Sequence, residues 1–172
     1  MLKMQKMQKL LDDNIVKNNN VEGMNLFERK VISLDIELSE FFNEVESWKY
    51  WKKHKGKDNI IGEASDALHF ILSLANDLKY ELVKPTNLIR KPNMLINDSE
   101  NWIDHSLITR YMGKIKKHLW VDFNTSKDPF ILNVIFKEMI KILNILGYTF
   151  KDLENAYIKK NKINFERQKG DY

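Results

Sequence analysis

The chain has 172 residues, with 28 Lys and Arg against 24 Asp and Glu and no Cys. This length suits a single domain, residues 1–172, with a real core, and the lack of Cys excludes disulfides, thiolate metal sites and a Cys nucleophile. Few Gly and Pro among abundant Leu, Ile, Lys and Glu favour an all-α fold. Lys is spread along the chain rather than gathered in a patch, so no stable nucleic-acid binding is expected.

No apolar run is long enough to span a bilayer, so no membrane partner is expected. The opening stretch MLKMQKMQKLLDDN turns acidic too early for a signal peptide. We therefore expect a cytoplasmic protein.

Apolar residues recurring at steps of three and four predict a bundle of about six helices. Their approximate bounds are 2–16, 25–53, 60–80, 102–120, 129–147 and 149–167. Residues 83–99, which contain two Pro, read as a long loop. Asp128 and Pro129 are expected to start the fifth helix, and Thr149 with Asp152 to cap the sixth.

The apolar stripes of these helices predict the core. From the first three helices the inward residues are Met4, Met7, Leu10, Leu11, Val31, Leu34, Leu38, Phe41, Val45, Trp48, Ile61, Ala64, Leu68, Ile71, Leu72 and Ala75. From the fourth helix they are Ile103, Leu107, Ile108, Met112 and Ile115. Trp102 and Trp120 are interpreted as packing residues.

A stripe of carboxylates runs beside the core stripe of the second helix, at Glu37, Glu40 and Glu44. Such like charges repel on a helix surface. Glu63 and Asp66 repeat the three-residue spacing on the next helix. If the two helices pack antiparallel across the short HKGKDN turn, the acidic pairs face each other and require a cation, for which Mg²⁺ suits the oxygen ligands. By pattern alone, an ordinary solvated acidic face is an equal alternative.

The sixth predicted helix carries Lys160, Asn164 and Arg167 on one face, because their spacing is four and three. A Lys, an amide and an Arg in line suit phosphate oxygens, although a polar helix surface is the alternative. Lys49 and Lys52, just beyond the acidic stripe, could add to a phosphate clamp.

The segments ELSEFFNEVESWKYWK and EASDALHFILSLAN together resemble the all-α dimeric dUTPases, a group of the MazG-like nucleoside triphosphate pyrophosphatases. Those proteins carry E-x-x-E, a turn, and E-x-x-D continuing into D-x-L-H-F. The stretch AYIKKNKINFERQKGDY is similar to their C-terminal signature, although its Gly comes one residue early, and MQKLLDDNI is similar to their opening helix. Residues 83–127 show no such match.

The resemblance implies that Glu37, Glu40, Glu63 and Asp66 bind Mg²⁺, in two or more ions. It implies hydrolysis of dUTP, and of dUDP, to dUMP with release of pyrophosphate or phosphate. Glu40 is our candidate to orient or deprotonate the water that attacks the α-phosphorus, because it would already lie at the metal centre.

The resemblance also implies a base pocket. Trp51 is expected to line it, and Gln8 to read the uracil, since an amide donates and accepts at once. Gln5 lies in an identical MQK and is the alternative to Gln8. His69 is either a pocket residue or a structural one, and the phosphate contacts are assigned to Lys160, Asn164, Arg167 and Lys49.

A homodimer is expected from the family resemblance. Two alternative functions stay open. One is a house-cleaning nucleotide pyrophosphatase with another base preference. The other is a helical regulatory protein that uses this fold to bind a protein partner. The four carboxylates together with the Lys-Asn-Arg stripe argue against a purely binding role.

Overall fold

The computed structural model describes residues 1–52, 56–85 and 104–168. These residues form helices and no strand, which confirms the all-α prediction. Six helices have 13 residues or more: α1 Leu2–Asn18, α2 Phe27–Val45, α3 Ile60–Asp77, α4 His105–Lys117, α6 Phe130–Ile145 and α7 Phe150–Arg167. Between α4 and α6 lie a π-helical turn, η2 His118–Phe123, and the short α5 Asn124–Ser126.

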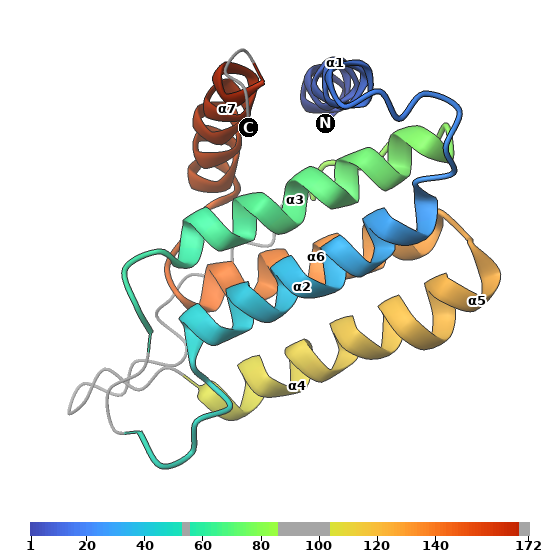
Figure 1. The fold of residues 1–172 in the computed structure, drawn as a ribbon. Coiled ribbons are helices and arrows are strands. Elements are labelled where there is room, and N and C mark those ends of the chain that lie inside the picture. The colour runs from blue at the N-terminus through green and yellow to red at the C-terminus, as the bar shows by residue number, and fades with distance from the viewer. Residues whose placement is uncertain (53–55, 86–103, 169–172) are drawn as a thin grey trace.

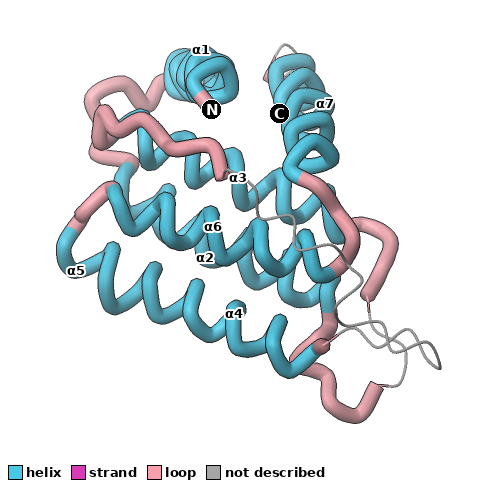
Figure 2. Tube along the Cα trace, turned by 180° about the vertical axis from the view of Figure 1, so that it is seen from behind, coloured by secondary structure: helices cyan, strands magenta, loops and turns pink. Residues whose placement is uncertain are grey.

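Helix α3 lies at the centre of this arrangement. It contacts α2, α6, α1 and α7. Figure 1 shows α2 and α3 side by side, with α6 behind them and α4 along the far side of α2. Helices α1 and α7 lie on the opposite side of α3 and cross it steeply, and Figure 2 shows the same order from behind. The α2–α3 pair therefore faces α7 at one edge, and the candidate site lies there.

The core follows the predicted stripes closely. On α2, Val31, Leu34, Leu38, Phe41 and Val45 are at most 1% exposed. Helix α3 is buried on more than one side because four helices contact it. Its fully buried apolar residues are Ala64, Ala67, Leu68, Ile71, Leu72, Leu74 and Ala75.

Helix α2 ends earlier than the sequence predicts, at Val45 rather than near Lys53. Glu46 takes a left-handed conformation with φ of 57°, and its N–H caps the helix by donating to the Phe42 carbonyl at 3.0 Å. A single residue in this conformation stops the helix. Trp48 therefore leaves the buried stripe and is 45% exposed, so the prediction that it lies in the core is wrong.

The N-terminal helix and the end of α3 also differ from the prediction. Leu10 is 64% exposed and does not face the core, because α1 turns Met4 and Leu11 toward α3 and α7 instead. Helix α3 ends at Asp77 rather than Tyr80. The other predicted core residues outside full burial are Met7, Ile61 and Leu107.

The fourth predicted helix, 102–120, is regular only as far as Lys117 and then widens into η2. Trp120 in this turn is 38% exposed, and its indole N–H donates to Asp35 at 2.9 Å, so it is only partly a packing residue. The predicted loop 83–99 lies outside the described residues from position 86 onward, as do Trp102 and Ile103.

Both predicted helix starts are confirmed. The Phe130 N–H donates to Asp128 at 2.9 Å, next to Pro129 at the start of α6. Thr149 and Asp152 form a reciprocal capping box at the start of α7. A search of the described residues finds no helix with both the length and the apolar character that crossing a bilayer demands.

Candidate active site

Three carboxylates from the two predicted acidic motifs come together between α2 and α3. One oxygen of Glu37, one of Glu63 and one of Asp66 all lie within 4.8 Å of one another. Each residue is partly buried. The three-residue spacing on α3 places Glu63 and Asp66 on adjacent turns, and the packing of α2 against α3 brings Glu37 close to them.

The electrostatics of this acidic cluster favour a bound cation. Burial, followed by the charges of Asp66, Glu40 and Glu63, raises the pKa of Glu37 to about 7. Burial also raises the pKa values of Glu63 and Asp66, and neighbouring carboxylates add to both shifts. Glu40 is exposed and lies outside the set of three close oxygens, but its charge contributes to all three shifts. The second motif residue of α2 therefore lies at the rim of the cluster.

Helix α7 supplies positive charge to the same place. The Lys160 ammonium donates to Oδ2 of Asp66 at 2.7 Å, and both side chains are partly buried. Arg167 is exposed, and its charge lowers the pKa of Asp66 against the effect of burial. Asn164 is partly buried and shares the helix face of these two residues. The predicted phosphate stripe thus faces the acidic cluster.

The donor set of the cluster fits Mg²⁺. All three side chains offer hard carboxylate oxygens, which this ion prefers. Mg²⁺ binds oxygen at about 2.0–2.1 Å, so two ligands of one ion lie at most about 4.2 Å apart. The three oxygens lie within 4.8 Å of one another, close to that limit, and the raised pKa values of Glu37 and Glu63 agree with a site where negative charge is unfavourable without a cation.

A buried polar network lies beside the cluster, between α1, α3 and α7. Gln8 is 4% exposed, and its amide nitrogen donates to Oδ1 of Asp12 at 2.7 Å. Its carbonyl oxygen lies 2.6 Å from Nδ1 of His69 and 3.2 Å from the Tyr157 hydroxyl. The His69 and Tyr157 rings pack with their centroids 4.5 Å apart. Gln8 therefore connects α1 to His69, which lies three residues after Asp66 on α3.

His69 is neutral at physiological pH. It is 5% exposed, and burial, assisted by the charge of Lys160, lowers its pKa to about 3. Its second ring nitrogen, Nε2, is buried and has no hydrogen-bond partner among the residues that the structure describes. A buried polar atom without a protein partner is uncommon, and Nε2 is therefore available to bond to a ligand or to water.

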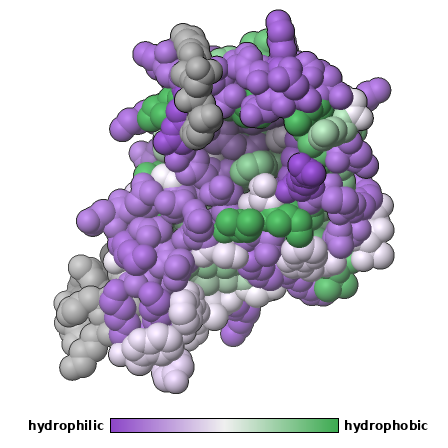
Figure 3. All heavy atoms as spheres, in the orientation of Figure 1, coloured by the Kyte–Doolittle hydropathy of each residue, from purple (hydrophilic) through white to green (hydrophobic). Residues whose placement is uncertain are grey.

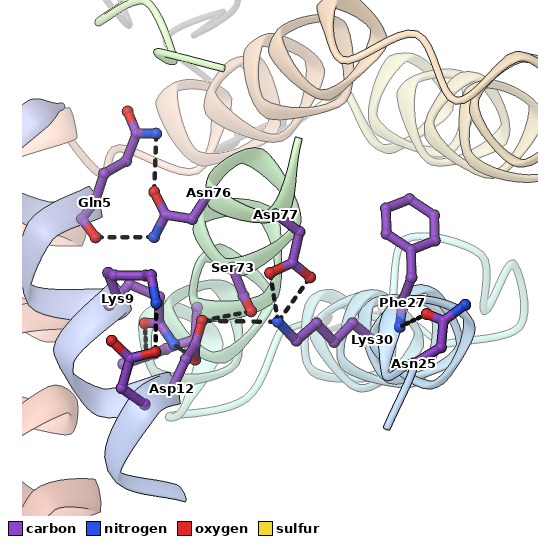
Figure 4. Close-up of polar contacts among 12 residues, drawn as sticks. Gln5, Lys9, Asp12, Asn25, Phe27, Lys30, Ser73, Asn76 and Asp77 are labelled. Carbon is purple, nitrogen blue, oxygen red and sulfur yellow. Dashed lines mark hydrogen bonds and ion pairs between the residues drawn. The ribbon is translucent and has the colours of Figure 1, made fainter. Parts of the chain in front are cut away.

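The two candidate glutamines have different surroundings. Gln5 donates to the Tyr80 carbonyl at 2.8 Å and to Asn76 at 3.3 Å, and its own carbonyl accepts from the Leu82 N–H at 3.0 Å. Figure 4 shows the paired contacts of Gln5 and Asn76. Gln5 therefore bonds to Tyr80 and Leu82 in the segment after α3, whereas Gln8 bonds to His69.

The segment after α2 forms a separate basic and aromatic turn. Lys49 lies 2.9 Å from Oε1 of Glu46, and Lys52 pairs with the other oxygen of the same carboxylate. Glu46 is 1% exposed, and both bonds hold its pKa well below the ordinary value. Trp51 is 62% exposed and touches Trp48 edge-on at a centroid distance of 5.6 Å. Lys49 is thus paired with Glu46 rather than with the acidic cluster.

Sequence reasoning missed several members of the buried network. They are Asp12, Ser73 and Asn161, whose amide donates to the Tyr157 hydroxyl at 3.3 Å. One signal was available, because Asp12 is four residues after Gln8 and so shares its helix face.

A protein-family model described as dUTPase matches residues 1–172, the whole chain. The chain belongs to the dUTPase family. Membership confirms the resemblance of the acidic motifs, and the all-α structure agrees with it. No individual curated protein gives a significant match.

Family membership makes this chain a dUTP diphosphatase, with dUTP as its substrate. The dUTPase family uses Mg²⁺, and the acidic cluster of Glu37, Glu63 and Asp66 is the group of described residues suited to hold it.

Proposed function

We propose that the acidic cluster, completed by Glu40, is the catalytic centre for hydrolysis of dUTP, and of dUDP, to dUMP. Water attacks the α-phosphorus, and pyrophosphate or phosphate leaves. The observation that carries this proposal is the convergence of three partly buried carboxylates next to the Lys160 ammonium. The four carboxylates would hold two or more Mg²⁺ ions, whose chemistry is to neutralise the triphosphate and to lower the pKa of a bound water.

Glu40 is the residue that we assign to the attacking water. It is exposed at the rim of the cluster, and it carries no hydrogen bond or ion pair to any described residue. Its side chain is therefore free to turn toward a water and accept its proton. A positioned general base contributes typically about 10²–10⁴-fold to the rate.

Helix α7 provides the phosphate contacts in this proposal. Lys160 exchanges its bond to Asp66 for a phosphate oxygen when the nucleotide binds. Arg167 suits two phosphate oxygens at once because its guanidinium is planar and forked. Asn164 lies between them and donates an amide N–H. Lys49 becomes available only if its bond to Glu46 opens.

The base would lie near the buried network. Gln8 and His69 are proposed to read the uracil, since their polar atoms meet beside the cluster. Trp51, which is largely exposed, is proposed to cover the base from the α2–α3 connection.

Isotope incorporation tests the position of attack. Hydrolysis of dUTP in ¹⁸O-water places the label in dUMP if the α-phosphorus is attacked. Label found only in the pyrophosphate or phosphate product contradicts the proposed step. Unlabelled enzyme-free nucleotide in the same water is the control for exchange.

We also propose a homodimer formed through the face of α2 and α4. Ile32 and Ile36 on α2 are about half exposed, at 48% and 51%. Figure 3 shows an apolar patch in the middle of this face, over α2. A groove of about 490 Å³ is lined by Ser39, Phe42, Asn43, Trp48, Thr109, Met112, Gly113 and Lys116. Light scattering at micromolar concentration should give twice the chain mass, and a stable monomer would contradict the dimer.

A further inference from the structure

A carboxylate that the chemistry above does not use lies at the end of the buried network. Asp12 on α1 accepts from the Gln8 amide through one oxygen and from the Ser73 hydroxyl through the other, each at 2.7 Å. The Lys30 ammonium lies 4.0 Å from Asp12 and 2.7 Å from Asp77. Figure 4 shows dashed lines from Asp12 to both Ser73 and Lys30, and from Lys30 to Asp77.

The chemistry of a carboxylate determines how Gln8 must be oriented. An ionised carboxylate can only accept hydrogen bonds, so Gln8 must turn its NH₂ group to Asp12. The Gln8 carbonyl oxygen then faces His69, and Nδ1 of that ring must carry the proton. Burial raises the pKa of Asp12, and the charge of Asp77 adds to this shift, whereas the bonds from Ser73 and Gln8 and the charge of Lys30 favour the ionised form.

The tautomer of His69 decides what the ring offers to a ligand. A neutral imidazole protonated on Nδ1 has a lone pair on Nε2, which is an acceptor. Nε2 of His69 is buried and lacks a hydrogen-bond partner among the described residues. The low pKa of His69 keeps the ring neutral, and the 2.6 Å contact of Nδ1 with the Gln8 carbonyl oxygen selects the tautomer protonated on Nδ1.

We propose that Asp12 is a positioning residue for base recognition, which fixes the Gln8 amide and thereby holds His69 as an acceptor for a ring N–H. This inference rests on the proposed function of the site. Uracil carries a proton on N3, whereas cytosine has an unprotonated N3 that would oppose the His69 lone pair. Asp12 thus favours uracil over cytosine without touching the base.

The tautomer is measured directly by ¹⁵N NMR of the full-length protein labelled at histidine. Its resonances are assigned to His69 by comparison with His69→Gln. Wild type should show a protonated Nδ1 and an unprotonated Nε2. Asp12→Asn should shift His69 partly or wholly to the other tautomer, because an amide can present either a donor or an acceptor to Gln8. Asp13→Asn is the matched control, since Asp13 is exposed and, among the described residues, its ion pair is with Lys9 at the surface.

Base selectivity gives the second readout. The ratio of kcat/KM for dUTP over dCTP should fall about tenfold or more in Asp12→Asn, because a buried hydrogen bond is then mismatched. Most of the change should lie in KM for dUTP, and Asp12→Glu should restore part of the ratio. Asp13→Asn should keep the wild-type ratio.

Failure of the inference and failure of the proposed function are distinguishable. A wild-type His69 protonated on Nε2, or an unchanged tautomer and an unchanged ratio in Asp12→Asn, overturns the role of Asp12. The wild-type spectrum decides the tautomer even if the variant does not fold. Absence of dUTP turnover in the wild type would contradict the proposed function alone, because the spectrum is recorded without nucleotide.

Discussion

The Lys160 ammonium on α7 bonds to Asp66 on α3 at 2.7 Å, although 94 residues separate them in sequence. This bond places a positive charge at the edge of three carboxylates that repel one another. Lys160 is also one of the residues that we propose to contact the phosphates of the nucleotide. Helix α7 is therefore bonded to the acidic cluster in the free protein, and under the proposed function Lys160 transfers this bond to a phosphate when the nucleotide binds.

Lys160→Met tests this dual role. The KM for dUTP should rise about tenfold or more, since a charge-assisted bond to phosphate is worth about 1.5–3 kcal/mol. Binding of Mg²⁺ without nucleotide should not weaken, because the competing ammonium has been removed. Steady-state kinetics and calorimetric titration of Mg²⁺ measure the two effects. Lys159→Met, at an exposed neighbouring position, is the control. Weaker metal binding with an unchanged KM would contradict the prediction.

Glu40→Gln should lower kcat about a hundredfold or more while the fold is retained. The substitution keeps the shape of the side chain and removes the charge needed for the water and for the metal. Circular dichroism and thermal unfolding check the fold, and Glu28→Gln, another exposed acid of α2, serves as the control. If Glu40→Gln turns over dUTP at the normal rate, Glu40 is not the base.

Part of this site could be predicted from the sequence because the signals are local. The apolar steps from Val31 to Val45 identify the buried face of α2, and the spacing of Glu63 and Asp66 places them on adjacent turns of α3. The end of α2 could not be predicted in this way. Glu46 adopts the left-handed conformation without being Gly or Asn, and this removes Trp48 from the core.

Contacts between residues that are far apart in the sequence could not be predicted from the spacing of apolar and charged residues. The two MQK repeats look alike, and only the packing of α1 on α3 separates Gln8, bonded to His69, from Gln5, bonded to Tyr80. Their sequence separations of 61 and 75 residues leave no periodic signal. The role of Asp12 depends on that packing in turn.

Stability without metal should depend on pH through Glu37. Its pKa rises from 4.5 to about 7 on folding, so between these values the folded state binds more protons than the unfolded state. The contribution of Glu37 to the free energy of unfolding therefore falls as the pH rises from about 4.5 to about 7. His69 has the opposite effect, because its pKa falls from 6.5 to about 3 on folding. Its contribution to the free energy of unfolding therefore increases as the pH rises from about 3 to about 6.5.

Comparison with Glu37→Gln isolates the effect of Glu37, because His69 contributes to both proteins. In excess chelator, Tm of the variant minus Tm of the wild type should increase as the pH is raised from about 4.5 to about 7.5. Added Mg²⁺ at neutral pH should raise Tm of the wild type more than that of the variant. A difference in Tm that does not change with pH would show that Glu37 titrates normally.

Arg167→Ala should weaken nucleotide binding or turnover about tenfold or more, with little change in Tm of the free protein. Arg167 is exposed at the end of α7, so its loss removes a phosphate contact rather than packing. Amide exchange of residues 157–168 should slow when Mg²⁺ and a non-hydrolysable dUTP analogue are added. Lys162→Ala, exposed on the same helix, is the control. Unchanged exchange together with normal activity of Arg167→Ala would make this end of α7 a solvated surface.

The most direct test of the catalytic assignment is the parallel measurement of product release from dUTP, dCTP, dTTP and UTP, for wild type and Glu63→Gln. With Mg²⁺ the wild type should hydrolyse dUTP in strong preference to the other nucleotides. That activity should disappear in excess chelator and in Glu63→Gln, which loses one of the three close carboxylates. Full turnover of dUTP in chelator, normal activity of Glu63→Gln, or no turnover of any nucleotide with Mg²⁺ would contradict it.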